Sequence, residues 1–385
     1  MPDNTTVHWV GTGLSTGPGL AGLSRHARVL VWGRTAAKAA GCLDRLDVRG
    51  EPRAYTPDAL AAEIAPGDVV VSMLPGTEHP GLLRICLDNG AHFACSSYAS
   101  DEIRAGAREA GERGLTVLTE IGLDPGLDHL FADVLVDQAV RALGSDARVT
   151  ASFTSYCGGV PAEPNEFRYR FSWAPRGVLT ALLSPAHYVE QGAKQVADRP
   201  WEVARPLEVD GERFEVYPNR DSLPYISQYG FPPRWQLDTF VRGTLRLDGW
   251  LDAWAEVFDE LRTGDPGRIT ELAAELAARH PTRPQDRDRV VLAVGLSATR
   301  ADGQSWSGRY SLDLTGEPGA SAMARCVSLP LAHGIGELLA DALPAGLVQG
   351  APDPATAGRW LEHLTAQGLP IRSSGAPDRS ASPAH

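Results

Sequence analysis

A carboxylate, Asp124, lies in the tight turn of the stretch from Thr116 to His129. The stretch begins as a short apolar run typical of a strand, turns through Asp124-Pro125-Gly126, and continues as an apolar-periodic run typical of a helix. This order places Asp124 and Asp128 at the carboxyl edge of a parallel sheet, where open α/β sheets bind ligands. A carboxylate in a cleft can transfer protons near neutral pH, so Asp124 is a candidate acid or base. The alternative is that Asp124 only shapes the turn.

A glycine-rich turn, residues 11–17 (Gly-Thr-Gly-Leu-Ser-Thr-Gly), follows the first apolar run. Gly11 suits a tight turn, and Gly13 lets the backbone approach a pyrophosphate at a helix N-terminus. The third glycine of the usual pattern comes one place late, and Thr16 takes its position. That position governs helix–strand packing, where small side chains also fit, so the turn still predicts a dinucleotide site.

The end of the second expected strand indicates which dinucleotide binds. It carries no Asp or Glu to hold the ribose hydroxyls, but Arg34 and Thr35 stand there, with Lys38 one turn later. These groups can hold a 2′-phosphate, which favours NADP over NAD. The alternative is that Arg34 is a solvated surface charge.

The elements that must position these residues alternate between strand and helix. Strands are expected at 7–13, 28–32, 68–74, 91–95 and 115–121, and helices at 17–24, 36–46, 57–64, 79–89, 100–113 and 127–140. This alternation predicts an α/β fold with a Rossmann-type, doubly wound parallel sheet.

The pattern changes after about residue 145. Strands are expected at 149–156, 240–247, 290–300 and 308–314, strands and turns over 168–173 and 202–216, and helices at 250–261, 268–279 and 320–343. This predicts a second, α+β domain with a mostly antiparallel sheet. Pro330 should kink or break the last helix, and the tail from Arg372 is expected to be disordered.

The bulk composition narrows the function classes. A net charge of −12 over 385 residues argues against sequence-independent binding of nucleic acid or anionic membranes. No run is long enough for a transmembrane helix, no secretory signal is apparent, and five scattered cysteines suit a reducing, cytoplasmic location. The dispersed histidines show no metal-binding spacing, so no metal site is expected.

Six segments combine hydroxyl, carboxylate, thiol and arginine residues. They are 96–100 (Ser-Ser-Tyr-Ala-Ser), 120–129 (around Asp124), 155–161 (Ser-Tyr-Cys-Gly-Gly-Val-Pro), 171–177 (Phe-Ser-Trp-Ala-Pro-Arg-Gly), 217–222 (Tyr-Pro-Asn-Arg-Asp-Ser) and 241–246 (Val-Arg-Gly-Thr-Leu-Arg). Their order and approximate spacing resemble the glutamate-forming saccharopine dehydrogenases, also called saccharopine reductases. A weaker resemblance at 316–331 extends toward the C-terminus.

This resemblance implies an NADP(H)-dependent enzyme of lysine metabolism that acts on a secondary amine joining two amino-acid skeletons. An amino-acid semialdehyde, 2-aminoadipate semialdehyde, would condense with glutamate, and the imine would be reduced to saccharopine, or the reverse. It also implies a homodimer, with an NADP-binding Rossmann domain over 1–128 and a substrate and dimerisation domain over 129–371. Residues 330–350 could pack back on the first domain, and 372–385 would be the disordered tail.

The resemblance also assigns roles to individual residues. Catalysis would involve Asp124, Tyr98 and Cys157. The amino-acid substrates would be bound by Ser97, Tyr98, Asp124, Arg176, Arg220 and Thr244. The cofactor would contact Gly11, Gly13, Leu14, Ser15, Arg34, Thr35, Ser72, Leu74, Pro75, Ser96, Ser97, Leu123 and Asp124.

Chemical reasoning supports several of these roles and leaves alternatives open. Bidentate guanidinium groups suit dicarboxylic substrates, and Arg242 and Arg246 should share a strand face with Thr244, although internal salt bridges would explain the same arginines. Arg176 and Arg220 stand in irregular, polar segments of the sequence. Cys157 could equally be a buried, inert thiol.

Two further residues lie near the Asp124 turn, and each has two alternative roles. Glu120 could face the cofactor amide or pair with an arginine. His129 is expected to be a structural residue at a helix start, with a ligand hydrogen bond as the alternative.

Two departures from the resemblance keep other functions open. The helical insert near 250–285 is short, and Gly76 stands where the family usually has an aromatic residue. One alternative is a related imine-reducing enzyme that joins a different amine and aldehyde or oxo acid. Another is a non-catalytic NADP-binding regulatory protein, although the second-domain segments would then be unnecessary.

Overall fold

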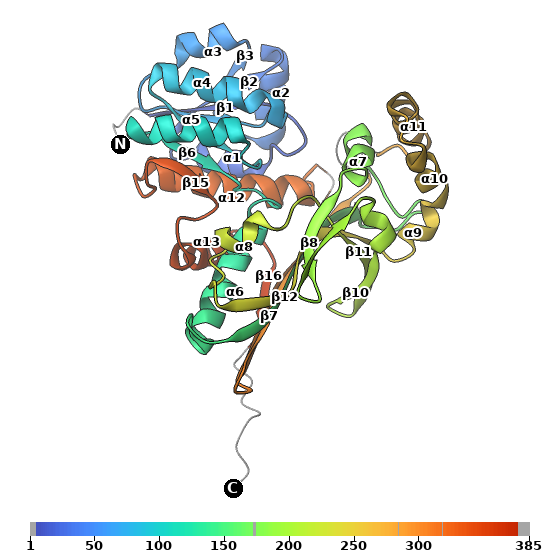
Figure 1. Ribbon diagram of the computed structural model, residues 1–385. Coiled ribbons are helices and arrows are strands. Elements are labelled where there is room, and N and C mark those ends of the chain that lie inside the picture. Colours follow the sequence, from blue (N-terminus) through green and yellow to red (C-terminus); the bar gives the residue numbers. More distant parts are fainter. Residues whose placement is uncertain (1–4, 172–174, 284, 318, 376–385) are drawn as a thin grey trace. The chain divides into compact units, whose positions relative to one another are not determined.

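The computed structural model describes residues 5–171, 175–283, 285–317 and 319–375. The chain divides into two compact units, one comprising Met1–Leu130 and Met323–Leu369, the other Phe131–Ala322 and Pro370–His385 (Figure 1). The C-terminal segment in the first unit is therefore longer than the 330–350 expected from the sequence. No described helix combines the length and hydrophobicity needed to cross a membrane.

The first unit is built on a seven-stranded sheet in which neighbouring strands are parallel, in the order β15-β6-β5-β4-β1-β2-β3. The strands are β1 (Thr6–Val10), β2 (Arg28–Gly33), β3 (Glu51–Ala54), β4 (Val69–Ser72), β5 (His92–Cys95), β6 (Thr116–Thr119) and β15 (Gly346–Gln349). Chain order runs outward in both directions from β1 and β4, so the topological switch point lies between them. Strand β3 was not predicted, because Glu-Pro-Arg-Ala carries almost no apolar signal and needs none at a sheet edge.

Helices pack on both faces of this sheet. They are α1 (Pro18–Leu23), α2 (Ala36–Leu46), α3 (Pro57–Glu63), α4 (His79–Asn89), α5 (Asp101–Glu112), the start of α6 (Leu127–Leu143), most of α12 (Ala322–Leu339), and α13 (Pro354–Ala366), with a 3-10 turn η1 (Gly76–Glu78) before α4. On one face, Leu60 of α3 and Leu83 of α4 share a core with Phe93 of β5. On the other, Gly334 of α12 lies against Leu118 of β6. The sheet is therefore doubly wound, as the sequence predicted.

Helix α12 runs through Pro330 without a break, so of the kink or break expected there the break does not occur. A proline inside a helix removes one backbone hydrogen bond and crowds the preceding turn. The flanking side chains of Cys326, Leu331 and Ile335 are fully buried. Their packing offsets the lost hydrogen bond, which a local sequence rule does not consider.

The second unit holds a nine-stranded, mostly antiparallel sheet, as predicted. The order along the sheet is β10-β11-β12-β7-β13-β14-β16, with β8 on β12 and β9 on β8. The strands are β7 (Val149–Pro161), β8 (Ala186–Glu190), β9 (Ala193–Ala197), β10 (Arg205–Val209), β11 (Glu212–Pro218), β12 (Trp235–Leu247), β13 (Asp288–Arg300), β14 (Ser305–Thr315) and β16 (Ile371–Ser374). Within this second sheet, the β12–β7 pairing is parallel and the other pairings of its described strands are antiparallel.

Short helices cover part of this second sheet (Figure 1). They are α7 (Pro175–Leu182), η2 (Pro200–Val203), α8 (Pro224–Gln228), α9 (Trp250–Ala253), α10 (Ala255–Thr263) and α11 (Pro266–Arg279). Trp250, Trp254 and Phe258 lie in an aromatic-rich core that joins α9, α10 and α11 to α7 and to Tyr217 of the sheet. The short insert is thus a set of helices that shares one core with α7 and with the sheet.

Three regions of the second half differ in detail from what was expected. Residues 168–171, where strand and turn were expected, form no strand, and Arg168 has a φ of +54°, outside the extended region; residues 172–174 lie outside the described ranges. The helix expected over 250–261 divides between α9 and α10 at Trp254. The start of the expected tail, through Ser374, forms β16 on β14, and residues 376–385 lie outside the described part.

Candidate functional site

The carboxyl edge of the first sheet gathers the predicted cofactor residues. The segments that follow β1, β2, β4, β5 and β6 are 11–15, 34–35, 73–75, 96–97 and 120–124. Because the strands are parallel, all five segments leave the sheet at the same edge. Ser15, Leu74 and Ser96 are half-buried there, and Pro75 is exposed.

The glycine turn has an open backbone at its tip. Gly11 has a φ of +121°, and a Cβ there would lie 2.9 Å from Met73 Cβ, so only glycine fits. A Cβ on Gly13 would meet nothing within 4 Å, and the neighbouring Leu14 side chain is 73% exposed. The turn therefore leaves backbone accessible to a phosphate group, although α1 itself has only six residues.

The buried Thr16 side chain stabilises this turn through two hydrogen bonds. Its hydroxyl donates to the Gly11 carbonyl at 3.2 Å and accepts from Trp9 Nε1 at 3.3 Å. The third glycine of the usual motif allows close packing of the helix, and here Gly19 has that role. A Cβ on Gly19 would lie 1.9 Å from the Ser328 carbonyl oxygen. Helix α1 therefore packs tightly on α12, a partner about 300 residues away that the local motif could not reveal.

The end of β2 carries the cationic pair that we associated with NADP. Arg34, Thr35 and Lys38 are exposed, and Thr35 Oγ1 accepts from the Lys38 backbone N–H at 3.2 Å, which caps α2. Within the described residues neither the Arg34 guanidinium nor the Lys38 ammonium has an acidic partner. Both cations and the Thr35 hydroxyl hydrogen are available to a phosphate, so these residues fit a 2′-phosphate.

A buried histidine that the sequence reasoning missed joins two predicted cofactor residues. His79 Nδ1 lies 2.9 Å from Ser72 Oγ, and His79 Nε2 lies 3.1 Å from Ser97 Oγ. Burial lowers the pKa of His79 to about 4, so the ring is neutral at neutral pH. The serines stand 7 and 18 residues from His79, and no spacing rule links them.

Tyr98 and Asp124 meet directly. The Tyr98 hydroxyl donates to Asp124 Oδ1 at 2.8 Å. The Asp124 turn is closed by a hydrogen bond from the Gly122 N–H to the Pro125 carbonyl, and a Cβ on Gly126 would lie 2.2 Å from Gly122 N. Leu123, another predicted cofactor contact, is buried at 5% exposure.

Behind the turn lies a fully buried set of ionisable residues. Glu120, with a φ of +56°, accepts from the Ala99 N–H at 3.1 Å and from Gln349 Nε2 at 2.7 Å. His129 lies between two carboxylates, 3.0 Å from Glu120 Oε2 and 3.4 Å from Asp128 Oδ2. Asp128 in turn accepts from the Gly126 N–H at 2.7 Å. Glu120 and His129 thus brace the turn from the interior of the unit.

In the second unit, Thr244 of β12 stands in register with Cys157 of β7 and Tyr217 of β11. Paired residues point to the same face of a sheet, so the three side chains form a row. Cys157 is buried at 9% exposure. Burial raises the pKa of the Tyr217 hydroxyl, against the opposing effect of the nearby Arg246 guanidinium and a hydrogen bond with Thr244.

Two buried arginines flank this row on the same strand, as the alternation predicted. Arg242, 5% exposed, lies 4.0 Å from the centre of the Tyr225 ring. Arg246, 9% exposed, lies 4.9 Å from the Tyr169 ring and 5.5 Å from the Trp250 ring. These are distances for cation–π contact.

Arg246 forms no ion pair with any acidic residue in the described ranges. Its cross-strand neighbour, Glu215, accepts instead from the backbone N–H groups of Gly249 and Leu251 at 3.1 and 2.7 Å. An internal salt bridge, our alternative explanation, therefore does not account for Arg246.

The other two predicted arginines are exposed. Arg176 lies in the first turn of α7, not in an irregular segment as expected, because the apolar residues Val178, Leu179 and Leu182 bury one helical face. Arg220 follows β11 with a φ of +57°, and its carbonyl accepts from the His187 N–H at 2.8 Å. A left-handed non-glycine residue held in this way often marks a functional loop.

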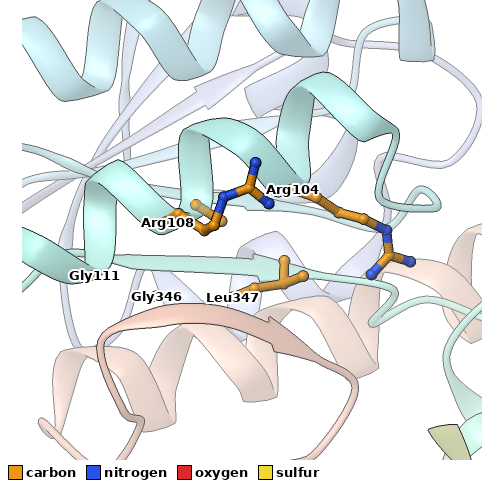
Figure 2. A pocket seen from close by; sticks show the side chains of 6 residues that line it. Arg104, Arg108, Gly111, Gly346 and Leu347 are labelled. Atoms are coloured by element: carbon orange, nitrogen blue, oxygen red, sulfur yellow. The ribbon is translucent and has the colours of Figure 1, made fainter. Parts of the chain in front are cut away.

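A separate hollow of about 350 Å³ lies along α5 and the edge strand β15 (Figure 2). Arg104 and Arg108 border it, with Gly346 and Leu347 opposite. None of the sequence-predicted site residues lines it. In the described ranges no group of three or more His, Cys, Asp or Glu is arranged to hold a metal ion.

Comparisons with known proteins agree with this architecture. The family model described as the saccharopine dehydrogenase NADP binding domain matches residues 7–118, and the saccharopine dehydrogenase C-terminal domain model matches residues 122–369. The chain is 34% identical over 344 residues to saccharopine dehydrogenase (NADP+, L-glutamate-forming) of Schizosaccharomyces pombe, covering 78% of this chain and 72% of the relative.

Other relatives match over part of their length. The Pyricularia oryzae protein of the same name is 39% identical over 198 residues, which is 50% of this chain and 42% of that protein. The match thus spans about two fifths of the length of that relative.

Among solved structures, apo saccharopine dehydrogenase (L-Glu forming) of Saccharomyces cerevisiae superposes with a TM-score of 0.82 at 26% identity, over 97% of this chain and all of that chain. Both family models, the fold and the relatives lead to one conclusion. The chain belongs to the saccharopine dehydrogenase family of NADP-binding oxidoreductases.

Proposed function

We propose that this chain is an NADP(H)-dependent oxidoreductase acting on the CH–NH bond of a secondary amine. In the synthetic direction it joins 2-aminoadipate semialdehyde to glutamate and yields saccharopine. The proposal follows the names of the relatives, which are described as L-glutamate-forming saccharopine dehydrogenases. The 2.8 Å hydrogen bond between Tyr98 and Asp124 is the observation that carries it.

The reaction needs a proton relay. Glutamate's amine adds to the aldehyde, water leaves, and the resulting imine takes up a hydride at carbon and a proton at nitrogen. Bound NADPH supplies the hydride. Tyr98 and Asp124 share a hydrogen bond at the edge where a dinucleotide binds, so a proton can pass between the phenol, the carboxylate and a substrate atom.

The cofactor preference is assigned to the end of β2. Arg34 and Lys38 have no acidic partner within the described residues, and the Thr35 hydroxyl can donate. A 2′-phosphate is the dianion that such a set suits, since no carboxylate stands there for ribose hydroxyls. The exposure of these residues supports the preference for NADP over NAD that their sequence indicated.

Recognition of the dicarboxylic substrates is assigned to cations of the second unit. Arg246 is desolvated and unpaired among the described residues, and Thr244 precedes it on the same strand face. Burying a guanidinium without a counter-ion costs folding free energy, and a bound substrate carboxylate would supply that counter-ion. Arg220, Arg176 and the Cys157 thiol remain proposed contacts, as does the homodimer, which light scattering can test.

One observation favours a second candidate, the same chemistry on a different amine and carbonyl pair. Gly76 has no positive φ, and a Cβ there would meet only His79 Cδ2, at 3.7 Å. Neither backbone nor packing therefore requires glycine. The missing side chain leaves room at the cofactor edge for a differently shaped substrate.

The decisive experiment is a turnover assay with purified protein. Oxidation of saccharopine by NADP+, measured as NADPH absorbance, should be detectable and should be lost in Asp124→Asn and reduced in Tyr98→Phe. A panel of other amine and aldehyde pairs with NADPH tests the second candidate. Binding of NADPH without turnover of any pair would instead support a non-catalytic cofactor-binding protein.

A further inference from the structure

His79 stands at the start of α4, where the chain returns from the exposed segment after β4. The residue is 2% exposed, and its ring connects the Ser72 hydroxyl at the end of β4 with the Ser97 hydroxyl just beyond β5. Ser72 is 1% exposed, whereas Ser97 is half-buried. The Ser72 hydroxyl thus lies in the interior, whereas Ser97 belongs to the segment that leaves β5 at the ligand edge.

The neutral ring restricts which way these hydrogen bonds run. A neutral imidazole donates from one nitrogen and accepts at the other. Within the described residues Ser72 Oγ has no partner besides His79, so a donor at Nδ1 would leave the buried Ser72 hydroxyl hydrogen unsatisfied. The favoured pattern therefore has Ser72 donating to Nδ1 and Nε2–H donating to Ser97 Oγ.

This pattern determines what Ser97 can offer to a ligand. Its oxygen accepts from His79, so its own hydrogen is free to point into the ligand edge. The sheet order gives the ligand's orientation: Arg34 ends β2 on one side of the switch point between β1 and β4, and Ser97 follows β5 on the other. A dinucleotide that crosses the switch point with its 2′-phosphate at Arg34 has its nicotinamide half on the side of Ser97.

We propose that His79 is a positioning residue that fixes Ser97 as a hydrogen-bond donor to the nicotinamide half of the cofactor. The proposal rests on the cofactor assignment made above and adds a residue and a direction to it. A polar acceptor, such as the carboxamide oxygen, is the chemistry that a fixed hydroxyl donor recognises.

Two conservative variants distinguish the hydrogen bond at Nδ1 from the hydrogen bond at Nε2. The amide of His79→Asn falls near Nδ1 and can bond Ser72, while the amide of His79→Gln reaches toward Nε2 and can bond Ser97. His79→Phe removes both bonds in a ring of similar size. NADPH affinity, measured by quenching of tryptophan fluorescence, should weaken about tenfold in the Phe and Asn variants and be largely restored in the Gln variant.

A double-mutant cycle tests whether the effect passes through Ser97. In a Ser97→Ala background, His79→Phe should cost little further NADPH affinity, whereas with Ser96→Ala, the matched control, the two effects should simply multiply. Thermal denaturation of each variant identifies those that fold.

The outcomes separate this proposal from the one it rests on. If the wild-type chain binds NADPH and His79→Phe weakens binding equally in both Ser97 backgrounds, His79 only supports the fold and the proposal is overturned. Equal affinity of wild-type and all folded His79 variants overturns it as well. A wild-type chain that binds no NADPH refutes the cofactor assignment and this inference with it.

Discussion

At the scale of single residues, Arg34 offers a direct test of cofactor preference. Arg34→Asp replaces an exposed cation by a carboxylate that can accept from both ribose hydroxyls and repels a 2′-phosphate. The ratio of kcat/KM for NADPH to that for NADH should fall by about 100-fold, the effect of roughly two lost or reversed charge-assisted contacts. Arg108→Asp, which changes the net charge equally on the exposed face of α5, should leave the ratio unchanged.

Replacing Arg246 should keep or raise stability and should weaken substrate binding. Arg246→Met keeps the apolar stem among Tyr169, Tyr217 and Trp250 but removes a desolvated charge. The melting temperature should stay level or rise, while KM for the amino-acid substrate rises about tenfold or more. The control is Arg213→Met. Arg213 is an exposed arginine of the neighbouring strand β11 and forms an ion pair with Asp248. A clear loss of stability with an unchanged KM would make Arg246 a structural residue.

At the scale of elements, the contact between α1 and α12 should support the glycine turn. A Cβ on Gly19 would lie 1.9 Å from the Ser328 carbonyl oxygen, whereas one on Gly22 of the same helix meets nothing within 4 Å. Gly19→Ala should therefore destabilise the fold by about 2 kcal/mol or more and weaken NADPH binding, because α1 must move away from α12.

Gly22→Ala provides the matched control for that prediction. It adds the same methyl group to the same helix and should be neutral or stabilising by up to about 1 kcal/mol. Urea denaturation of both variants measures the difference. Similar stabilities for the two would mean that α1 can shift without cost.

Local sequence patterns predicted the limits of some helices and strands but not of others. Helix α4 begins and ends where the sequence predicted, since Pro80 and Gly90 mark its ends. Strand β3 was missed because its residues carry no apolar periodicity, and α12 passes Pro330 because buried neighbours hold it. Local propensity sets an element's limits only where tertiary packing does not override it.

At the scale of the whole molecule, stability should depend on pH through buried histidines. Burial lowers the pKa of His79 from 6.5 to about 4, so below pH 6.5 the unfolded chain takes up a proton that the folded chain does not. Stability therefore falls as pH drops from 6.5 toward 4, by at most about 3 kcal/mol for this residue. Burial, with repulsion from His363, shifts the pKa of His333 in the same direction.

Urea denaturation at several pH values tests this dependence. The slope of unfolding free energy against pH is proportional to the number of protons taken up on unfolding. Between pH 6.5 and 4 this number should be smaller by up to about one in His79→Gln than in the wild type, since the titrating group is gone. Carboxylates titrate alike in both proteins and cancel in the comparison. Identical slopes would show that His79 is protonated alike in both states.

The sequence by itself determined the parallel alternation, the glycine turn, the Asp124 turn and the shared face of Arg242, Thr244 and Arg246. Each depends on a few adjacent residues and on a strand or helix period, which are local properties. These patterns gave the class of fold and the sheet edge that carries the proposed site.

Only the tertiary structure decided how the individual side chains are used. It joined Tyr98 to Asp124, connected His79 with two serines, and enclosed Arg246 in aromatic rings without a counter-ion among the described residues. These partners stand far apart in the chain, and packing sets the direction of each side chain. No spacing in the sequence encodes such contacts, because they form only when strands and helices distant in the chain are brought together.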